Sequence, residues 1–187
     1  MYLNYKNIVV LVILFFYPSA KSAENIFLYK GTFSRTIEIE ELNKFNETRK
    51  PSNKLKSLMK ITNLNDKDLH NFLSYKIEVP LKTSSRLMNS KIGEVFLSRL
   101  SKIIYPNKIS NIKTSIKAIR SGVILSSYKN NESINLIDFF KEYPNKNIAI
   151  DLNALNKALK KAESLKELID FYSNSPFQKL KDGRSST

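Results

Sequence analysis

Side chains that can act as a nucleophile, general base or metal ligand are few in this 187-residue chain, which has one histidine and no cysteine. The lack of cysteine excludes disulfides, thiolate metal sites and cysteine nucleophiles, and a single histidine excludes a site with several imidazole ligands. A serine–histidine–acid triad would have to use His70, which lies in the segment 68–71 on the expected solvent side of a helix. We therefore predict no catalytic residue, no metal and no cofactor. An esterase that depends on His70 is kept as an alternative.

Other patterns that could carry chemistry have simpler structural interpretations. The fragment nearest to a Gly-x-Ser-x-Gly elbow is Arg120–Gly122, which lacks the first glycine, and four glycines in all leave no phosphate-binding loop. Asp138 and Glu142 lie four residues apart on a predicted helix, where two like charges usually share a solvated face. Asp151 stands between a predicted strand and a predicted helix, and we expect it to be the structural N-cap of that helix.

Basic residues dominate the charge of the chain, which has a net charge of +14 and a sequence pI of about 9.8. Lys113, Lys117 and Arg120 fall on one face of a predicted helix and could contact an anionic surface, or they could simply be solvated. Arginine, which binds phosphates through a bidentate fork, is scarce beside lysine. The sequence leaves two interpretations open: a peripheral binder of anionic membrane or another polyanion, and a composition without functional meaning.

The run from Ile112 to Leu152 predicts the central elements that would position these groups. Apolar residues recur with a period near 3.6 over the helix that starts at Ile112 and reaches Tyr128, and again over Ile134 to Tyr143. We expect both stripes to be buried, with Ser133 as the N-cap of the second helix and Pro144 as its end. A groove between the two helices is our candidate for a partner or an apolar ligand. It would be edged by Ile119, Val123, Phe139 and Phe140.

The N-terminus resembles a secretory signal peptide. A short head with Lys6 precedes the apolar run Ile8–Tyr17, then Pro18 and small residues follow. The apolar run is shorter than the ~20 residues of a membrane-spanning helix, so we expect cleavage near Ser22 or Ala23 and not an uncleaved signal anchor, the alternative. We expect export, which disfavours nucleic acid as a partner.

The remaining segments predict one mostly helical α+β domain over residues 23–178, after the signal peptide 1–22 and before a disordered tail 179–187. A hairpin is expected at 25–39, and residues 147–151 are the best candidate for a third strand. We expect a compact multi-helix domain with a small antiparallel sheet from that hairpin and the later strand. The other expected helices cover residues 40–48, 53–61, 65–73, 83–88, 91–104, 152–161 and 164–172.

Several of these stretches, taken in order, resemble a known family, the cyanobacterial "alpha/beta hydrolase of unknown function" domain. The matching pieces span roughly Glu24 to Leu155. They are Ile37–Leu42, Ser90–Glu94 with Leu97–Leu100, Ala118–Arg120 with Val123–Leu125, Leu136–Pro144 and Ile148–Leu152. The resemblance implies a helical domain that usually lies between an export signal and a serine-hydrolase domain, which holds the catalytic residues. It also implies a location in the periplasm or the thylakoid lumen. We expect no room for such a domain before Thr187, so the hydrolase label does not carry over to these residues.

Together these expectations favour an exported, non-catalytic accessory module. Its partner would be a separate exported α/β-hydrolase or a lipid-like apolar ligand, as the resemblance implies. The basic binder of anionic membrane and the esterase dependent on His70 remain the alternatives.

Overall fold

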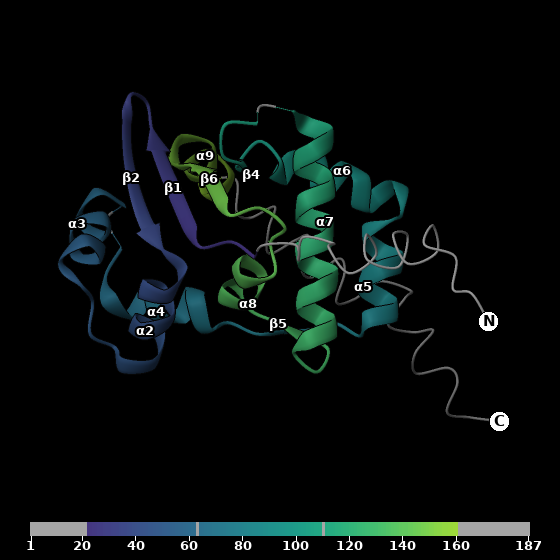
Figure 1. Cartoon of the computed structure of the whole chain (residues 1–187), viewed down its shortest axis with the longest axis horizontal. Coiled ribbons are helices and arrows are strands. Elements are labelled where there is room, and N and C mark those ends of the chain that lie inside the picture. The colour runs from purple at the N-terminus through teal and green to yellow at the C-terminus, as the bar shows by residue number, and fades with distance from the viewer. Residues whose placement is uncertain (1–21, 63, 110, 161–187) are drawn as a thin grey trace, which may run out of the picture.

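The computed structural model describes residues 22–62, 64–109 and 111–160, and 58% of the described residues are helical. The signal-peptide prediction, the expected helix at 164–172 and the expected tail all lie outside them. Eight helices and a small four-stranded sheet confirm the predicted mostly helical class (Figure 1). The helices are α2 (Ile39–Thr48), α3 (Asn53–Thr62), α4 (Asp66–Ser74), α5 (Leu81–Met88), α6 (Lys91–Leu100), α7 (Ile112–Lys129), α8 (Leu136–Lys141) and α9 (Leu152–Lys160).

The four-stranded sheet has the order β2-β1-β6-β4. Its strands are β1 (Asn25–Lys30), β2 (Phe33–Glu38), β4 (Ile104–Pro106) and β6 (Asn147–Asp151). The predicted hairpin is present, with Ile26 opposite Ile37 and Gly31 at a φ of +62° in the turn, a conformation that glycine adopts without strain. The third strand also joins the hairpin, but β6 runs parallel to β1. The sheet is therefore mixed and not antiparallel, because the chain re-enters it from the end at which β1 begins.

The fourth strand was not expected from the sequence. We predicted a helix from Lys91 to Ile104, but α6 ends at Leu100, and Ile104–Pro106 pairs with β6 as β4 at one edge of the sheet. An edge strand can hold Pro106 because a missing N–H is tolerated where no further strand pairs. A second, two-stranded sheet pairs β3 (Ile77–Glu78) with β5 (Ser133–Ile134). Ser133 therefore belongs to a strand, and Asn135 is the cap of α8 through the bond from the Asp138 N–H to its side chain.

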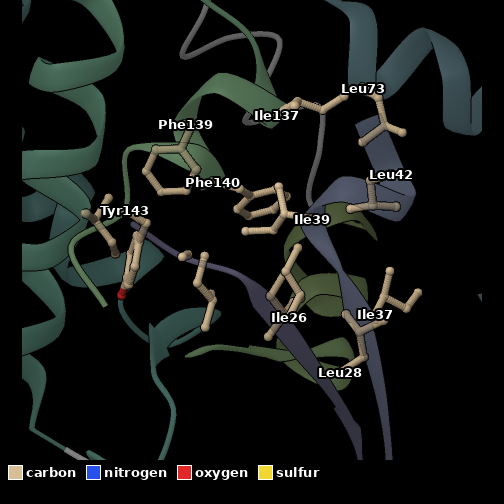
Figure 2. Packing of buried hydrophobic residues seen from close by; sticks show 14 of the residues in the cluster. Ile26, Leu28, Ile37, Ile39, Leu42, Leu73, Ile137, Phe139, Phe140 and Tyr143 are labelled. Atoms are coloured by element: carbon tan, nitrogen blue, oxygen red, sulfur yellow. The ribbon is translucent and has the colours of Figure 1, made fainter. Parts of the chain in front are cut away.

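One continuous core joins the main sheet to the helices. Isoleucine and leucine side chains from β1 and β2 meet those of α2, α4 and α8, as the labelled residues of Figure 2 show. On the other side of the molecule, α5 and α6 pack against α7 (Figure 1). No helix in the described part of the chain is both long and apolar enough to span a bilayer.

The long helix α7 buries only the middle of the apolar stripe that we expected, and its buried face extends over small residues. Its buried residues are mostly small: Ser115, Ile116, Ala118, Ile119, Gly122, Ser126 and Ser127. Ile112 and Tyr128, which we placed in the buried stripe, are 54% and 68% exposed. The small side chains allow neighbouring elements to approach the helix closely, so the buried face is centred on them and not on the largest apolar residues. On α6, the large apolar residues Ile92 and Val95 are likewise exposed.

Candidate functional site

The four residues of the predicted groove come from α7 and α8, which pack together, but most of them lie inside the core. Ile119, Phe139 and Phe140 are buried, and Val123 is half-buried. Gly122 permits this approach, because a Cβ there would lie 2.9 Å from the Phe139 ring. In this arrangement the four residues form internal packing and do not edge an open groove.

Aromatic rings extend this packing along α8 to Tyr143, as Figure 2 shows. The ring centroids of Phe139 and Phe140 are 5.6 Å apart, and the edge of Tyr143 meets Phe139 at 5.8 Å. Burial raises the pKa of Tyr143 well above its usual value. Its hydroxyl and that of Ser126 are buried and have no hydrogen-bond partner among the described residues. These are the polar groups that sequence patterns missed, since both lie in otherwise apolar surroundings.

The basic residues singled out on α7 have different environments. Lys113 and Lys117 are exposed. Arg120 instead forms an ion pair with Glu94 of α6, and its Nε donates to the Met88 carbonyl at 2.9 Å. Arg120 thus connects α5 and α6 to α7, and only the two lysines of this stripe present their ammonium groups to solvent.

His70 lies half-buried on α4, and its nearest hydroxyl group is already engaged. Ser74 Oγ lies 3.4 Å from His70 Nδ1, but it donates to the backbone carbonyl of His70 at 2.8 Å. A serine hydroxyl held by its own helix backbone is not prepared to attack a substrate. Among the described residues, no group of three or more histidine, cysteine, aspartate or glutamate side chains is placed to hold a metal ion.

Two of the three carboxylates singled out in the sequence, Glu142 and Asp151, hold structural contacts. Burial raises the pKa of Asp138, while Lys141 and Lys76 oppose that shift. Glu142 pairs with Lys129 at 2.7 Å. Asp151 Oδ1 accepts from the backbone N–H groups of the residues two and three positions later, at 2.8 and 2.9 Å, and so caps α9.

Several large apolar residues are exposed along α4 and β3 and at the C-terminal end of α7. Phe72 lies on α4, Tyr75 directly follows that helix and Ile77 lies on β3, and each is about half exposed or more. The side chain of Ser127, which precedes the exposed Tyr128, donates to the Val79 carbonyl at 2.7 Å. That bond brings the end of α7 against the strand that contains Ile77. We call Phe72, Tyr75, Ile77 and Tyr128 the aromatic surface.

Two shallow hollows flank α3. One is lined by Pro51, Lys56, Met59, Lys60, Leu64 and Asp66, and the other by Arg35, Thr36, Ile37, Asn53, Lys54 and Ser57. Neither hollow is lined by a residue that we predicted for binding or catalysis.

Comparison with known proteins gives one match. A family model described as "Alpha/beta hydrolase of unknown function (DUF1400)" matches residues 22–151. No curated protein and no solved structure matches the chain.

Proposed function

The chain belongs to the family described as alpha/beta hydrolase of unknown function, and from that premise we propose that it is an exported, non-catalytic accessory module for a separate hydrolase. One observation carries the non-catalytic part of the proposal: most of the candidate acid–base groups already hold structural contacts. The Ser74 hydroxyl beside His70 donates to the helix backbone, Glu142 is ion-paired, and Asp151 caps α9.

The surface through which the module acts is, in this proposal, the aromatic surface and not the buried contact between α7 and α8. Tyrosine and phenylalanine are enriched in protein interfaces because they bury a large area at low cost in side-chain entropy. Tyr75 and Tyr128, 61% and 68% exposed, are the expected anchors. Export of the chain places the partner in the periplasm or the thylakoid lumen.

Capture from the native exported fraction tests the partner. Tagged full chain is compared with Tyr75→Ala/Tyr128→Ala, and a fluorophosphonate probe detects serine hydrolases in each eluate. The proposal expects a labelled hydrolase with the unmodified chain and at least tenfold less with the double variant. Phe33→Ala, which removes an exposed ring from the hairpin, is the matched control and should capture as much as the unmodified chain. A bound lipid without any hydrolase would instead support the carrier alternative.

A second measurement tests the absence of catalysis. Purified full chain is assayed against short-chain aryl esters together with His70→Ala. Ester hydrolysis that disappears in His70→Ala would establish the esterase alternative and overturn the accessory proposal, whatever the capture experiment shows.

A further inference from the structure

The opposite end of α7 carries a second unusual surface, formed by the loop after β4 and the first two turns of the helix. Its residues are Lys108, Ile109, Ile112, Lys113 and Lys117, and all five are exposed. We call them the basic–apolar surface, and we propose that it docks on an anionic lipid bilayer. This inference goes beyond the accessory function, since even the nearest α7 residues of the two surfaces, Lys117 and Tyr128, lie 11 residues apart on the helix, about 17 Å at 1.5 Å per residue.

The apolar part of this surface consists of two branched aliphatic side chains presented to water. Ile109 is 40% exposed and Ile112 is 54% exposed, and both lie within the five residues 108–112. Isolated apolar residues on a surface need no explanation, but apolar side chains grouped beside lysines are typical of segments that lie in a membrane interface. The acyl-chain boundary can accept both isoleucines.

The charged part gives the complementarity with anionic headgroups. The ion pairs of the described residues use Arg120, Lys129 and Lys146, so Lys108, Lys113 and Lys117 keep their ammonium groups for another partner. Lys113 also lies in the first turn of α7, where no acidic residue is present and the helix dipole disfavours a cation. An anionic surface opposite these lysines removes that unfavourable interaction and adds Coulomb attraction.

The chemistry favours lipid over other polyanions. Lysine is a flexible point charge that suits a fluid layer of headgroups, whereas arginine forms the bidentate contacts with fixed phosphates. Arg120, the one arginine of the α7 stripe, is held by Glu94 and the Met88 carbonyl. A nucleic acid or another soluble polyanion would also leave the two isoleucines in water.

A tryptophan probe locates the bilayer, because the chain contains no tryptophan. Full-length Ile112→Trp is mixed with vesicles of phosphatidylglycerol and phosphatidylcholine that carry brominated acyl chains. We expect a blue shift and strong quenching for Ile112→Trp, and neither for the exposed control Tyr128→Trp, which lies 16 residues further along α7, about 24 Å away at 1.5 Å per residue. All variants keep the apolar N-terminal run, so its contribution is equal in every comparison. Equal quenching of both probes, or none for Ile112→Trp, would overturn the proposal.

Charge variants test the lysines against net charge alone. Lys108→Gln/Lys113→Gln/Lys117→Gln should weaken binding to the anionic vesicles by about 100-fold, because each lysine near an anionic membrane usually raises the affinity about fivefold. The control Lys54→Gln/Lys56→Gln/Lys60→Gln removes the same charge from exposed positions of α3, on the far side of the molecule (Figure 1), and should weaken binding much less. Equal losses in the two triple variants, or equal binding to purely zwitterionic vesicles, would show that this surface is not the docking site.

Discussion

Replacing Tyr143 with phenylalanine should raise the free energy of unfolding, which is the reverse of the usual effect of deleting a tyrosine hydroxyl. The side chain is 0% exposed, and its hydroxyl has no hydrogen-bond partner in the part of the chain that the structure describes. The ring packs edge-on against Phe139, with an interplanar angle of 75°. Phenylalanine keeps this ring and its apolar contacts, so the hydroxyl is the only group that changes.

The magnitude follows from the desolvation of that hydroxyl. A buried hydroxyl without a partner costs about 1–3 kcal/mol on the scale of protein mutational data, and its removal should recover that amount. Tyr29→Phe is the matched control, because the Tyr29 hydroxyl donates to Asn107 Oδ1 at 2.8 Å. Loss of that bond should lower stability by about 0.5–1.5 kcal/mol, so the two Tyr→Phe variants should differ in sign.

The same hydroxyl predicts a dependence on pH. Burial raises the pKa of Tyr143 in the folded state, so the folded chain holds this proton at a pH where the unfolded chain, near its ordinary value of about 10, releases it. The part of the folding stability that depends on this proton is therefore fully present below pH ~10. Above that pH it decreases by about 1.4 kcal/mol per pH unit. The stability gain from Tyr143→Phe should grow accordingly between pH 9 and pH 11. Tyr105, whose pKa is also raised, is present in both proteins and cancels in the difference.

Urea unfolding followed by circular dichroism at pH 7, 9, 10 and 11 measures these differences. A loss of 1 kcal/mol or more for Tyr143→Phe at pH 7 would mean that the hydroxyl has a partner, and the argument from its isolation would fail. A gain that stays constant up to pH 11 would refute the titration argument alone.

Further substitutions are checked by the same urea assay at pH 7. Gly93→Ala should cost at least about 3 kcal/mol, because its Cβ would overlap a backbone carbonyl of α5, whereas Gly122→Ala meets only a ring that can shift and should cost about 1 kcal/mol. Equal losses at the two glycines would contradict this distinction. Asp151→Ala should cost about 1 kcal/mol as a lost N-cap and Asp151→Asn only a few tenths; a large effect of the asparagine would point to a role for the charge. Arg120→Ala should destabilise more than Glu94→Ala, since only the arginine also bonds a backbone carbonyl, and the coupling between them should stay below about 1 kcal/mol for this partly exposed pair.

Local signals in the sequence predicted the hairpin and the types of most elements well. The hairpin and the starts of the helices predicted from residues 65 and 91 each depend on residues close in the chain. Ile37 pairs in the hairpin, and Asn65 and Ser90 cap α4 and α6, whereas Ile39 begins α2 and does not extend β2. The strand at 147–151 was also recognisable, because its two-residue period is independent of its partner. These features could be predicted since short-range physics determines them.

Relations between distant segments were harder to predict. The direction of β6 beside β1 depends on the path of more than a hundred intervening residues, and β4 exists because β6 offers it an edge. The buried face of α7 was misjudged because periodicity gives weight to large apolar residues. Gly122 and Ser126 are buried there because they are small. The sequence pattern therefore placed the four groove residues on two helices that do pack together. It did not predict that these residues are buried, because burial depends on tertiary packing.

The parallel pairing of β1 with β6 also determines when this domain can fold. The side chains of Asn25 and Asn147, bonded at 3.1 Å, lie 122 residues apart in the chain. Pairing of segments this distant requires closure of a long loop, which makes folding slow relative to a helical protein with local contacts. Until Asn147–Asp151 has been synthesised, β1 has only its hairpin partner, and a single hairpin is marginal in water. This topology therefore prevents the chain, which we propose to be exported, from completing its sheet early in synthesis. The sheet can be completed only after nearly the whole domain has been synthesised.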